Sequence, residues 1–180
     1  MNLTTPDKVK QSSRSISKNI ENERIERCII EAEQLYIKPR IGDALYIDLL
    51  KYVNAEEIEQ ATFPKEYKML LSGGNYKAIV CGEKESRMFM GLEEALNYYV
   101  YAKLIKNFDY NVTRFGGAMV KRDDYSERAD IKEKLTMEKD ALHTADIYMD
   151  DCLLFLKTKK VPLFRFGRAK NRLKIQVIGE

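Results

Sequence analysis

The apolar residues of the chain recur mostly at intervals of three and four, the spacing that places them along one side of an α-helix. Such stripes run through residues 25–36, 41–53, 92–108 and 131–156. The last belongs to the longest periodic run, 126–157, which as a continuous helix would span roughly 45 Å. We therefore expect an all-α fold, a helical bundle of about four to five helices, whose last helix bends or protrudes from the domain.

Prolines and glycines divide these helices from one another. Pro39 is expected to end the first helix, and the second begins behind Gly42. Residues 75–90 leave two possibilities open, because their apolar residues partly alternate, as in a short strand, but an irregular segment is equally compatible. Residues 109–124 contain a Gly-Gly and an Asp-Asp pair and are predicted to form a loop.

The two ends of the chain differ from its middle. Residues 1–20 are polar and lack periodicity, so we expect an extended N-terminal arm that does not pack. Residues 21–157 form the predicted helical domain. Residues 158–180 form a basic C-terminal tail with two alternating runs, which either pair as a hairpin of short β-strands or add to a sheet edge of another chain.

Charge separates the same three parts. The whole chain carries +3, whereas residues 1–20 carry +3 and residues 152–180 carry +7, with eight Lys or Arg against one acid. The middle, with nineteen basic and twenty-six acidic residues, carries −7. An acidic body between basic ends favours contacts of the ends with nucleic acid, with an acidic partner or with a neighbouring copy.

The tail holds the principal candidate docking residues. Aromatic and basic side chains are interleaved there, a mixture that suits a nucleic-acid groove, an acidic protein surface or simply a solvated tail. The candidate docking residues are Lys157, Lys159, Lys160, Phe164, Arg165, Phe166, Arg168, Leu173, Ile175 and Val177. A second candidate set lies in the predicted loop and consists of Arg114, Phe115, Lys121 and Arg122.

Enzymatic and metal-dependent functions are disfavoured. The chain has one histidine, and no serine, cysteine or threonine stands in a nucleophile motif. Cys28, Cys81 and Cys152 are far apart and odd in number, so we expect buried reduced thiols rather than disulfides or a zinc site. We expect no cofactor and no metal. No apolar run is long enough to span a membrane and no signal peptide is visible, so we expect a protein that stays in a cytoplasm.

The order of several sequence segments resembles the head–tail connector, or adaptor, proteins of tailed bacteriophages. The segments are IIEAEQLYIKPRIGDALYIDLLKYV, YKMLLSGG, GLEEALNYYVYAKLI, NVTRFGG and a final YMDDCLLFL, which together cover roughly residues 20–157. The most specific element is EAEQLYIKPRIGDALY followed later by NVTRFG. The resemblance is greatest to versions from phages and prophages of gut bacteria, such as the crAss-like group, and extends less clearly to the tail.

The resemblance implies a structural virion protein that is assembled in the host cytoplasm and located at the head–tail interface. Such proteins form a ring, commonly of twelve copies, beneath the portal, extend the DNA channel and present a platform to a downstream tail or second ring protein. The tail would then dock on the portal or a neighbouring subunit, and the loop 109–124 would lie at a subunit junction or face the channel. The alternative is a small nucleic-acid-binding helical protein that grips phosphates with its basic arms.

Overall fold

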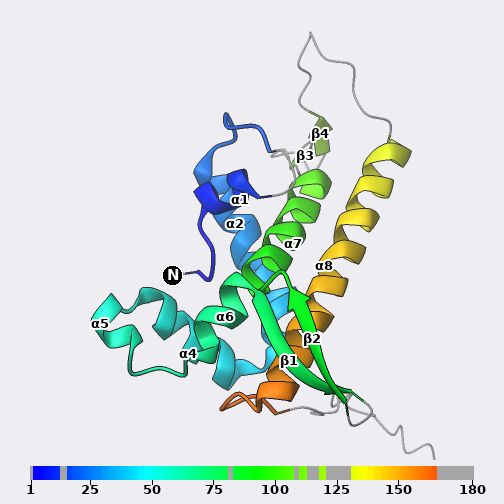
Figure 1. Cartoon of the computed structure of the whole chain (residues 1–180). Coiled ribbons are helices and arrows are strands. Elements are labelled where there is room, and N and C mark those ends of the chain that lie inside the picture. Colours follow the sequence, from blue (N-terminus) through cyan, green and yellow to red (C-terminus); the bar gives the residue numbers. More distant parts are fainter. Residues whose placement is uncertain are drawn as a thin grey trace, which may run out of the picture.

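The computed structural model describes residues 2–12, 16–80, 83–107, 110–112, 118–120 and 131–165, and they are mostly helical (Figure 1). This confirms the mostly helical fold expected from the apolar periodicity. The helices and strands are, in chain order, α1 (Pro6–Gln11), α2 (Asn22–Ala32), the π-helix η1 (Glu33–Ile37), α3 (Lys38–Ile41), α4 (Asp43–Asn54), α5 (Glu57–Gln60), α6 (Glu66–Ser72), β1 (Gly74–Val80), β2 (Glu83–Phe89), α7 (Leu92–Asn107), β3 (Tyr110–Val112), β4 (Ala118–Val120) and α8 (Ile131–Lys159).

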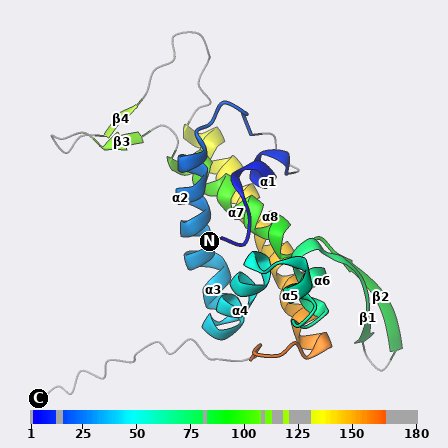
Figure 2. The ribbon, with the colours of Figure 1, turned by 90° about the vertical axis from the view of Figure 1, so that its left-hand side faces the viewer.

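Helix α7 lies at the centre of the fold, between α2 on one side and α8 on the other (Figures 1 and 2). Its buried side chains point in every direction and include Leu96, Tyr98 and Tyr99. Two ion pairs of 3.3 Å tie its exposed end to its neighbours, Lys103 to Glu31 of α2 and Lys106 to Glu138 of α8. A helix with aromatic side chains on several faces is surrounded by others, and that is the position α7 takes.

The first long helix does not end at Pro39, contrary to the sequence prediction. A π turn over 33–37 inserts one residue, so that the amide of Lys38 donates to the carbonyl of Glu33, and the helix continues as α3. Pro39 is tolerated because it lies in the first turn of α3, where an amide donor is least needed. The helix ends instead at Gly42, whose φ of +87° turns the chain into α4.

The π turn also moves the buried face of this helix. A strict helical stripe would bury Leu35, but that side chain is 57% exposed. Glu33 and Ile37 are buried in its place, at 1% and 0% exposure. The extra residue rotates the following helix, so the apolar periodicity that is valid up to Ala32 fails beyond it.

Strands β1 and β2 form a two-stranded antiparallel sheet, so the strand alternative for 75–90 is the correct one for the described residues of that range. The sheet refines the all-α expectation to a mostly helical fold with small hairpins. Its inner face packs on α8, where the ring of Phe155 lies 5.2 Å from that of Tyr76 and 4.8 Å from that of Phe89, between ring centres. The aromatic contacts explain why a short hairpin with a largely polar second strand is stable against the bundle.

Two glycines clamp the base of this hairpin. The backbone of Gly73, which ends α6, crosses the backbone of Gly91, which precedes α7. A Cβ atom built on Gly91 would lie 2.4 Å from the amide nitrogen of Gly73, and one built on Gly73 would lie 2.5 Å from the carbonyl carbon of Met90. Both residues have positive φ, of +92° and +75°. Close approach and backbone conformation therefore both require glycine here.

The expectation that residues 1–20 form an unpacked arm is wrong for the part that the structure describes. Leu3 and Val9 are buried in the core, at 2% and 0% exposure, and α1 packs on α2 and α7. Thr5 caps α1 by accepting a hydrogen bond from the amide of Lys8. The reason is that Leu3 and Val9, with the partly buried Ile16 and Ile20, hold the segment on the bundle, although so few apolar residues create no periodic pattern.

Two further boundaries differ from expectation. Within the predicted loop 109–124, β3 and β4 pair as a short antiparallel hairpin. The domain also continues past residue 157, because α8 extends to Lys159 and Val161 beyond it is 3% exposed. The described residues of the α8 start, 132–140, contain no buried side chain, whereas Ala141, Ala145 and Met149 are fully buried. The first third of this helix of about 43 Å therefore protrudes from the core.

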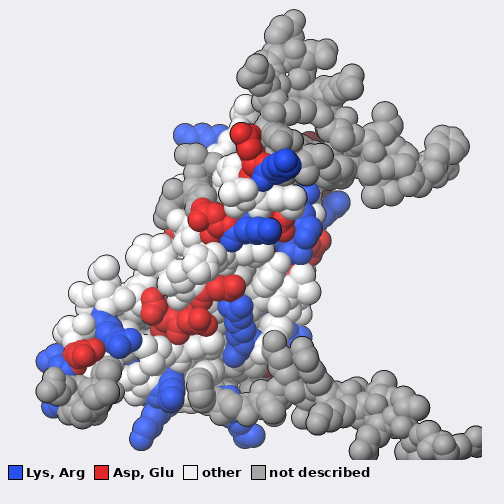
Figure 3. All heavy atoms as spheres, turned by 90° about the vertical axis from the view of Figure 1, so that its right-hand side faces the viewer, with Lys and Arg blue, Asp and Glu red and all other residues white. Residues whose placement is uncertain are grey.

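Charged side chains of both signs are interspersed on the side of the molecule where α8 lies. Figure 3 shows this face, on which the described Lys and Arg side chains lie among Asp and Glu side chains and are separated by uncharged surface. The described residues on this face do not form one continuous basic area.

Candidate functional site

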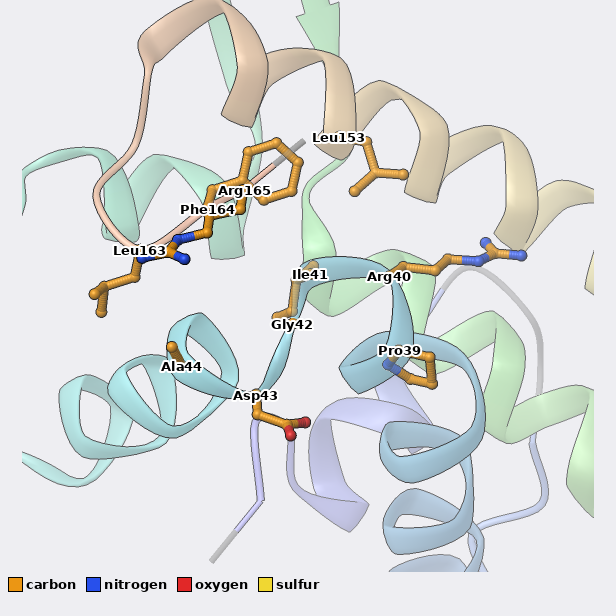
Figure 4. Close-up of a pocket in the computed structure, with 10 residues that line it drawn as sticks. All are labelled: Pro39, Arg40, Ile41, Gly42, Asp43, Ala44, Leu153, Leu163, Phe164 and Arg165. Atoms are coloured by element: carbon orange, nitrogen blue, oxygen red, sulfur yellow. The ribbon is translucent and has the colours of Figure 1, made fainter. Parts of the chain in front are cut away.

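A pocket of about 510 Å³ lies where the α3–α4 corner meets the chain that follows α8 (Figure 4). One wall is the corner itself, and the other comes from the C-terminal end of α8 and the segment after it. The lining residues are Pro39, Arg40, Ile41, Gly42, Asp43, Ala44, Leu153, Leu163, Phe164 and Arg165. Its volume falls within the range of roughly 300–1,000 Å³ typical of binding pockets.

The corner is shaped by Gly42. Its φ of +87° and ψ of 153° are accessible almost only to glycine, and the open space around it leaves the backbone exposed to the pocket. Ile41 anchors the corner in the core at 2% exposure, whereas Asp43 and Ala44 are exposed in the first turn of α4. The result is a hollow with both polar and apolar lining, whose rim carries both signs of charge.

Arg40 leaves the pocket and reaches α8, as its side chain in Figure 4 shows. Its guanidinium pairs with the carboxylate of Asp146 at 2.5 Å and donates to the hydroxyl of Tyr99, which in turn donates to the same carboxylate at 2.5 Å. The ring of Tyr99 stacks on that of Tyr36 with centres 4.4 Å apart. This cluster fixes α3, α7 and α8 relative to one another and so fixes one wall of the pocket.

The ionisation of this cluster follows from its contacts. Burial, together with the hydrogen bond to Asp146, raises the pKa of Tyr99, which therefore stays a neutral donor. Burial opposes ionisation of Asp146, but the hydrogen bonds from Tyr99 and Arg40 outweigh it and hold the pKa of Asp146 below its usual value. A neutral phenol and an ionised carboxylate make a structural lock, with no group held ready to accept a proton at neutral pH.

A second buried polar group secures the N-terminal segment. Glu33 accepts hydrogen bonds from the amide of Leu3 at 2.6 Å and from the hydroxyl of Tyr46 at 2.8 Å. Burial raises the pKa of Glu33 above its ordinary value. The hydroxyl of Thr4 donates to Asn97 of α7, and Lys8 pairs with Glu93. These contacts explain how a mostly polar segment is held on the bundle.

The structure brings only part of the predicted docking set together. Phe164 and Arg165 line the pocket, and Phe164 also packs on the core. Lys157 and Lys159 lie exposed on the last turn of α8, and Lys160 follows with a φ of +50°. The remaining candidates lie outside the described residues, and they are Phe166, Arg168, Leu173, Ile175 and Val177 of the tail and Arg114, Phe115, Lys121 and Arg122 of the loop.

Sequence reasoning missed the wall formed by residues 39–44. It used KPRIGDA as part of a resemblance but did not propose it as a binding surface. The available signal was Gly42 directly behind the buried Ile41, since a glycine between two helices indicates an exposed corner. The sequence could not distinguish Leu153 from the core residues of α8, because buried and pocket-lining side chains of a helix recur at the same spacing.

Other chemistry is sparse in the described residues. Within those ranges, no group of three or more His, Cys, Asp or Glu side chains could hold a metal ion. Cys28 and Cys152 are buried free thiols, as predicted, and burial raises the pKa of both, while Cys81 lies outside the described residues. In the same part of the chain, no helix has both the length and the apolar character to cross a membrane.

Comparison with known proteins adds one finding. The model of a family of unknown function, DUF6712, matches residues 41–172, which is most of the chain. The chain belongs to that family. No curated protein and no solved structure matches it. The DUF6712 match begins at Ile41 and therefore includes most of the α3–α4 corner and all the pocket residues of α8 and beyond.

Proposed function

We propose that this DUF6712 protein is a structural virion protein, a head–tail connector or adaptor of a tailed bacteriophage. Copies would form a ring, of twelve in the commonest arrangement, beneath the portal, extend the DNA channel and present a platform to a downstream tail or second ring protein. The proposal starts from the sequence resemblance over residues 20–157, and the mostly helical fold is compatible with it.

The observation that carries the proposal is where the basic tail leaves the domain. Val161 is buried and Phe164 packs on the core, so the chain is held on the domain up to Phe164. It leaves from the rim of the pocket whose other wall belongs to EAEQLYIKPRIGDALY, the most specific segment of the resemblance. The start of the candidate docking tail, at Phe164 and Arg165, and this corner thus line one pocket, as expected where a partner is engaged by both.

The structure also sharpens the experiment. A deletion from residue 161 would remove the buried Val161 and damage the fold, so the tail should be removed as residues 166–180. Portal binding is measured by mass analysis of the purified protein alone and mixed with the portal of the same phage, and helical content by circular dichroism. We expect the full chain to assemble on the portal and the shortened chain to keep its helical signal but lose binding. Unchanged assembly of the shortened chain would contradict docking by the tail.

The second candidate function is that of a nucleic-acid-binding protein, which the charge of +7 over residues 152–180 favours. It predicts that the monomer alone binds duplex DNA and that its affinity falls steeply with salt. Fluorescence anisotropy with a labelled duplex over a salt series separates the two functions. Tight, steeply salt-dependent binding by a monomer that ignores the portal would replace the connector proposal with this one.

A further inference from the structure

Ile58 of α5 is the most exposed large apolar side chain in the described part of the protein, at 86% exposure. It lies on a short helix that stands apart from the α7–α8 pair, at one edge of the molecule (Figure 1). Glu56 and Glu59, both exposed, flank it in sequence. An isolated apolar side chain with acidic neighbours has the character of an anchor residue that fits a partner's pocket.

The α5 turn is held in place rather than loose. The side-chain amide of Gln60 donates to the carbonyl of Tyr52 at 3.3 Å and to that of Ala55 at 3.1 Å. The ring of Phe63 packs edge-on against that of Tyr52, with centres 5.7 Å apart. Ile58 is therefore presented on a preorganised turn, which lowers the entropy lost when it binds.

The pocket at the α3–α4 corner has the complementary character. Its apolar lining includes Leu153, Leu163 and Phe164, which can receive an aliphatic side chain. Two of its charged residues are already paired, Arg40 with Asp146 and Asp43 with Lys38 at 3.7 Å. The exposed guanidinium of Arg165 on the rim, with Lys160 nearby in sequence, supplies positive charge for acidic flanks.

The two surfaces lie at opposite ends of α4. The pocket includes the first residues of this helix, and α5 follows its last residue. A helix of 12 residues holds its ends about 18 Å apart, so a copy cannot insert its own α5 into its own pocket. Two unlike surfaces held apart on one rigid element generate a head-to-tail contact, the kind from which rings are built.

We propose that Ile58 of one copy, with Glu56 and Glu59 around it, occupies the α3–α4 pocket of the next copy. The inference rests on the proposed ring and assigns it a subunit contact. Removal of the Ile58 side chain beyond its Cβ would weaken assembly on the portal about tenfold or more, because an anchor side chain contributes strongly when buried. The same change at Ile30, an exposed isoleucine of α2 outside the contact, would not.

Cysteine cross-linking tests the contact directly. Ile58→Cys and Ala44→Cys are introduced together and separately in a chain in which Cys81 is replaced by serine, while the buried Cys28 and Cys152 remain. Oxidation is performed on the free protein at high concentration and on the portal-bound assembly. We expect a ladder of dimers, trimers and larger species from the double variant, and only dimers from an equimolar mixture of the two single variants. A control pairs Ala44→Cys with Ile30→Cys, which is 51% exposed on α2, and should give no ladder.

The outcomes separate the contact from the function. Portal-bound rings that give no ladder would overturn the contact and leave the connector proposal standing. Efficient dimers from Ile58→Cys alone would indicate a symmetric α5–α5 contact and also overturn it. Failure of the native chain to assemble on the portal, together with the absence of cross-links in the free double variant at high concentration, would overturn both. A quantitative check compares Ile58→Ser with Ile30→Ser, and equal loss of portal assembly in the two variants, with unchanged helical content, would also refute the specific role of Ile58.

Discussion

Replacement of Gly91 by alanine should be among the most destabilising single changes in the chain. The new methyl group would lie 2.4 Å from the amide nitrogen of Gly73 and 2.4 Å from the carbonyl oxygen of Leu71. Both are backbone atoms, which cannot rotate away as a side chain can. Relief would require the crossing between the end of α6 and the start of α7 to open, which would shift the β1–β2 hairpin on α8.

The magnitude has two parts. A φ of +92° is unfavourable for alanine and costs about 1–3 kcal/mol. Forcing an extra carbon into a closed contact adds about 1–3 kcal/mol. The total of roughly 2–6 kcal/mol is a large fraction of the 5–15 kcal/mol that typically stabilises a domain.

Gly42→Ala is the matched control, because Gly42 has a similar φ of +87° but no atom within 4 Å of the new carbon. It should lose only the conformational part. The assay is urea unfolding followed by far-ultraviolet circular dichroism, with free energies compared at equal m-values. The midpoint of Gly91→Ala should lie clearly below that of Gly42→Ala. Equal midpoints would show that the steric clash is absorbed and would refute the crossing as a rigid feature.

Three further predictions concern buried groups. Glu33→Gln should gain stability relative to the native chain as pH rises above about 4.5, because burial raises the folded-state pKa of Glu33 and the unfolded chain loses its proton first. Urea midpoints of both proteins measured from pH 4 to 8 test this, and a constant difference between the midpoints would contradict it. Asp146→Asn should be less stable than the native chain at pH 7. The difference in stability should shrink as pH falls below about 3.8, since the folded-state pKa of Asp146 is lowered. Acid unfolding curves of the two proteins that stay parallel would count against this. With Cys81 replaced by serine, a thiol reagent should label Cys28 and Cys152 only once urea unfolds the chain, and rapid labelling of the native protein would refute their burial.

Periodicity predicted the helices well because most of their buried faces follow it without interruption. The central position of α7 agrees with its aromatic residues, because Tyr98 and Tyr99 cannot share one face of a helix and both are buried. The prediction failed at the π turn before Lys38, where one extra residue shifts the helical repeat. The shift buries Glu33 and exposes Leu35. Nothing in the local composition marks that insertion, since it is stabilised by contacts with Leu3 and Tyr46.

The candidate site was predicted only in part for a similar reason. Phe164 and Arg165 stand out in sequence because aromatic and basic residues alternate there. Their counterpart at Gly42 is more than a hundred residues away, and only the tertiary fold, in which Arg40 of α3 pairs with Asp146 of α8, brings them together. The role proposed for Ile58 needed the exposed fraction of its side chain, because a single isoleucine among glutamates fits equally well as the buried residue of a short amphipathic helix.

The cluster of Arg40, Tyr99 and Asp146 has a consequence for how the protein folds. Its hydrogen bonds join residues 59, 47 and 106 positions apart, and Thr4 reaches Asn97 across 93 positions. Contacts so distant in sequence form late, after the entropy of closing long loops has been overcome. Helices α2 and α7 therefore gain their full protection only when α8 docks. Native-state hydrogen exchange should show one slow cooperative unit comprising all three, with the amides of α5 exchanging independently and much faster.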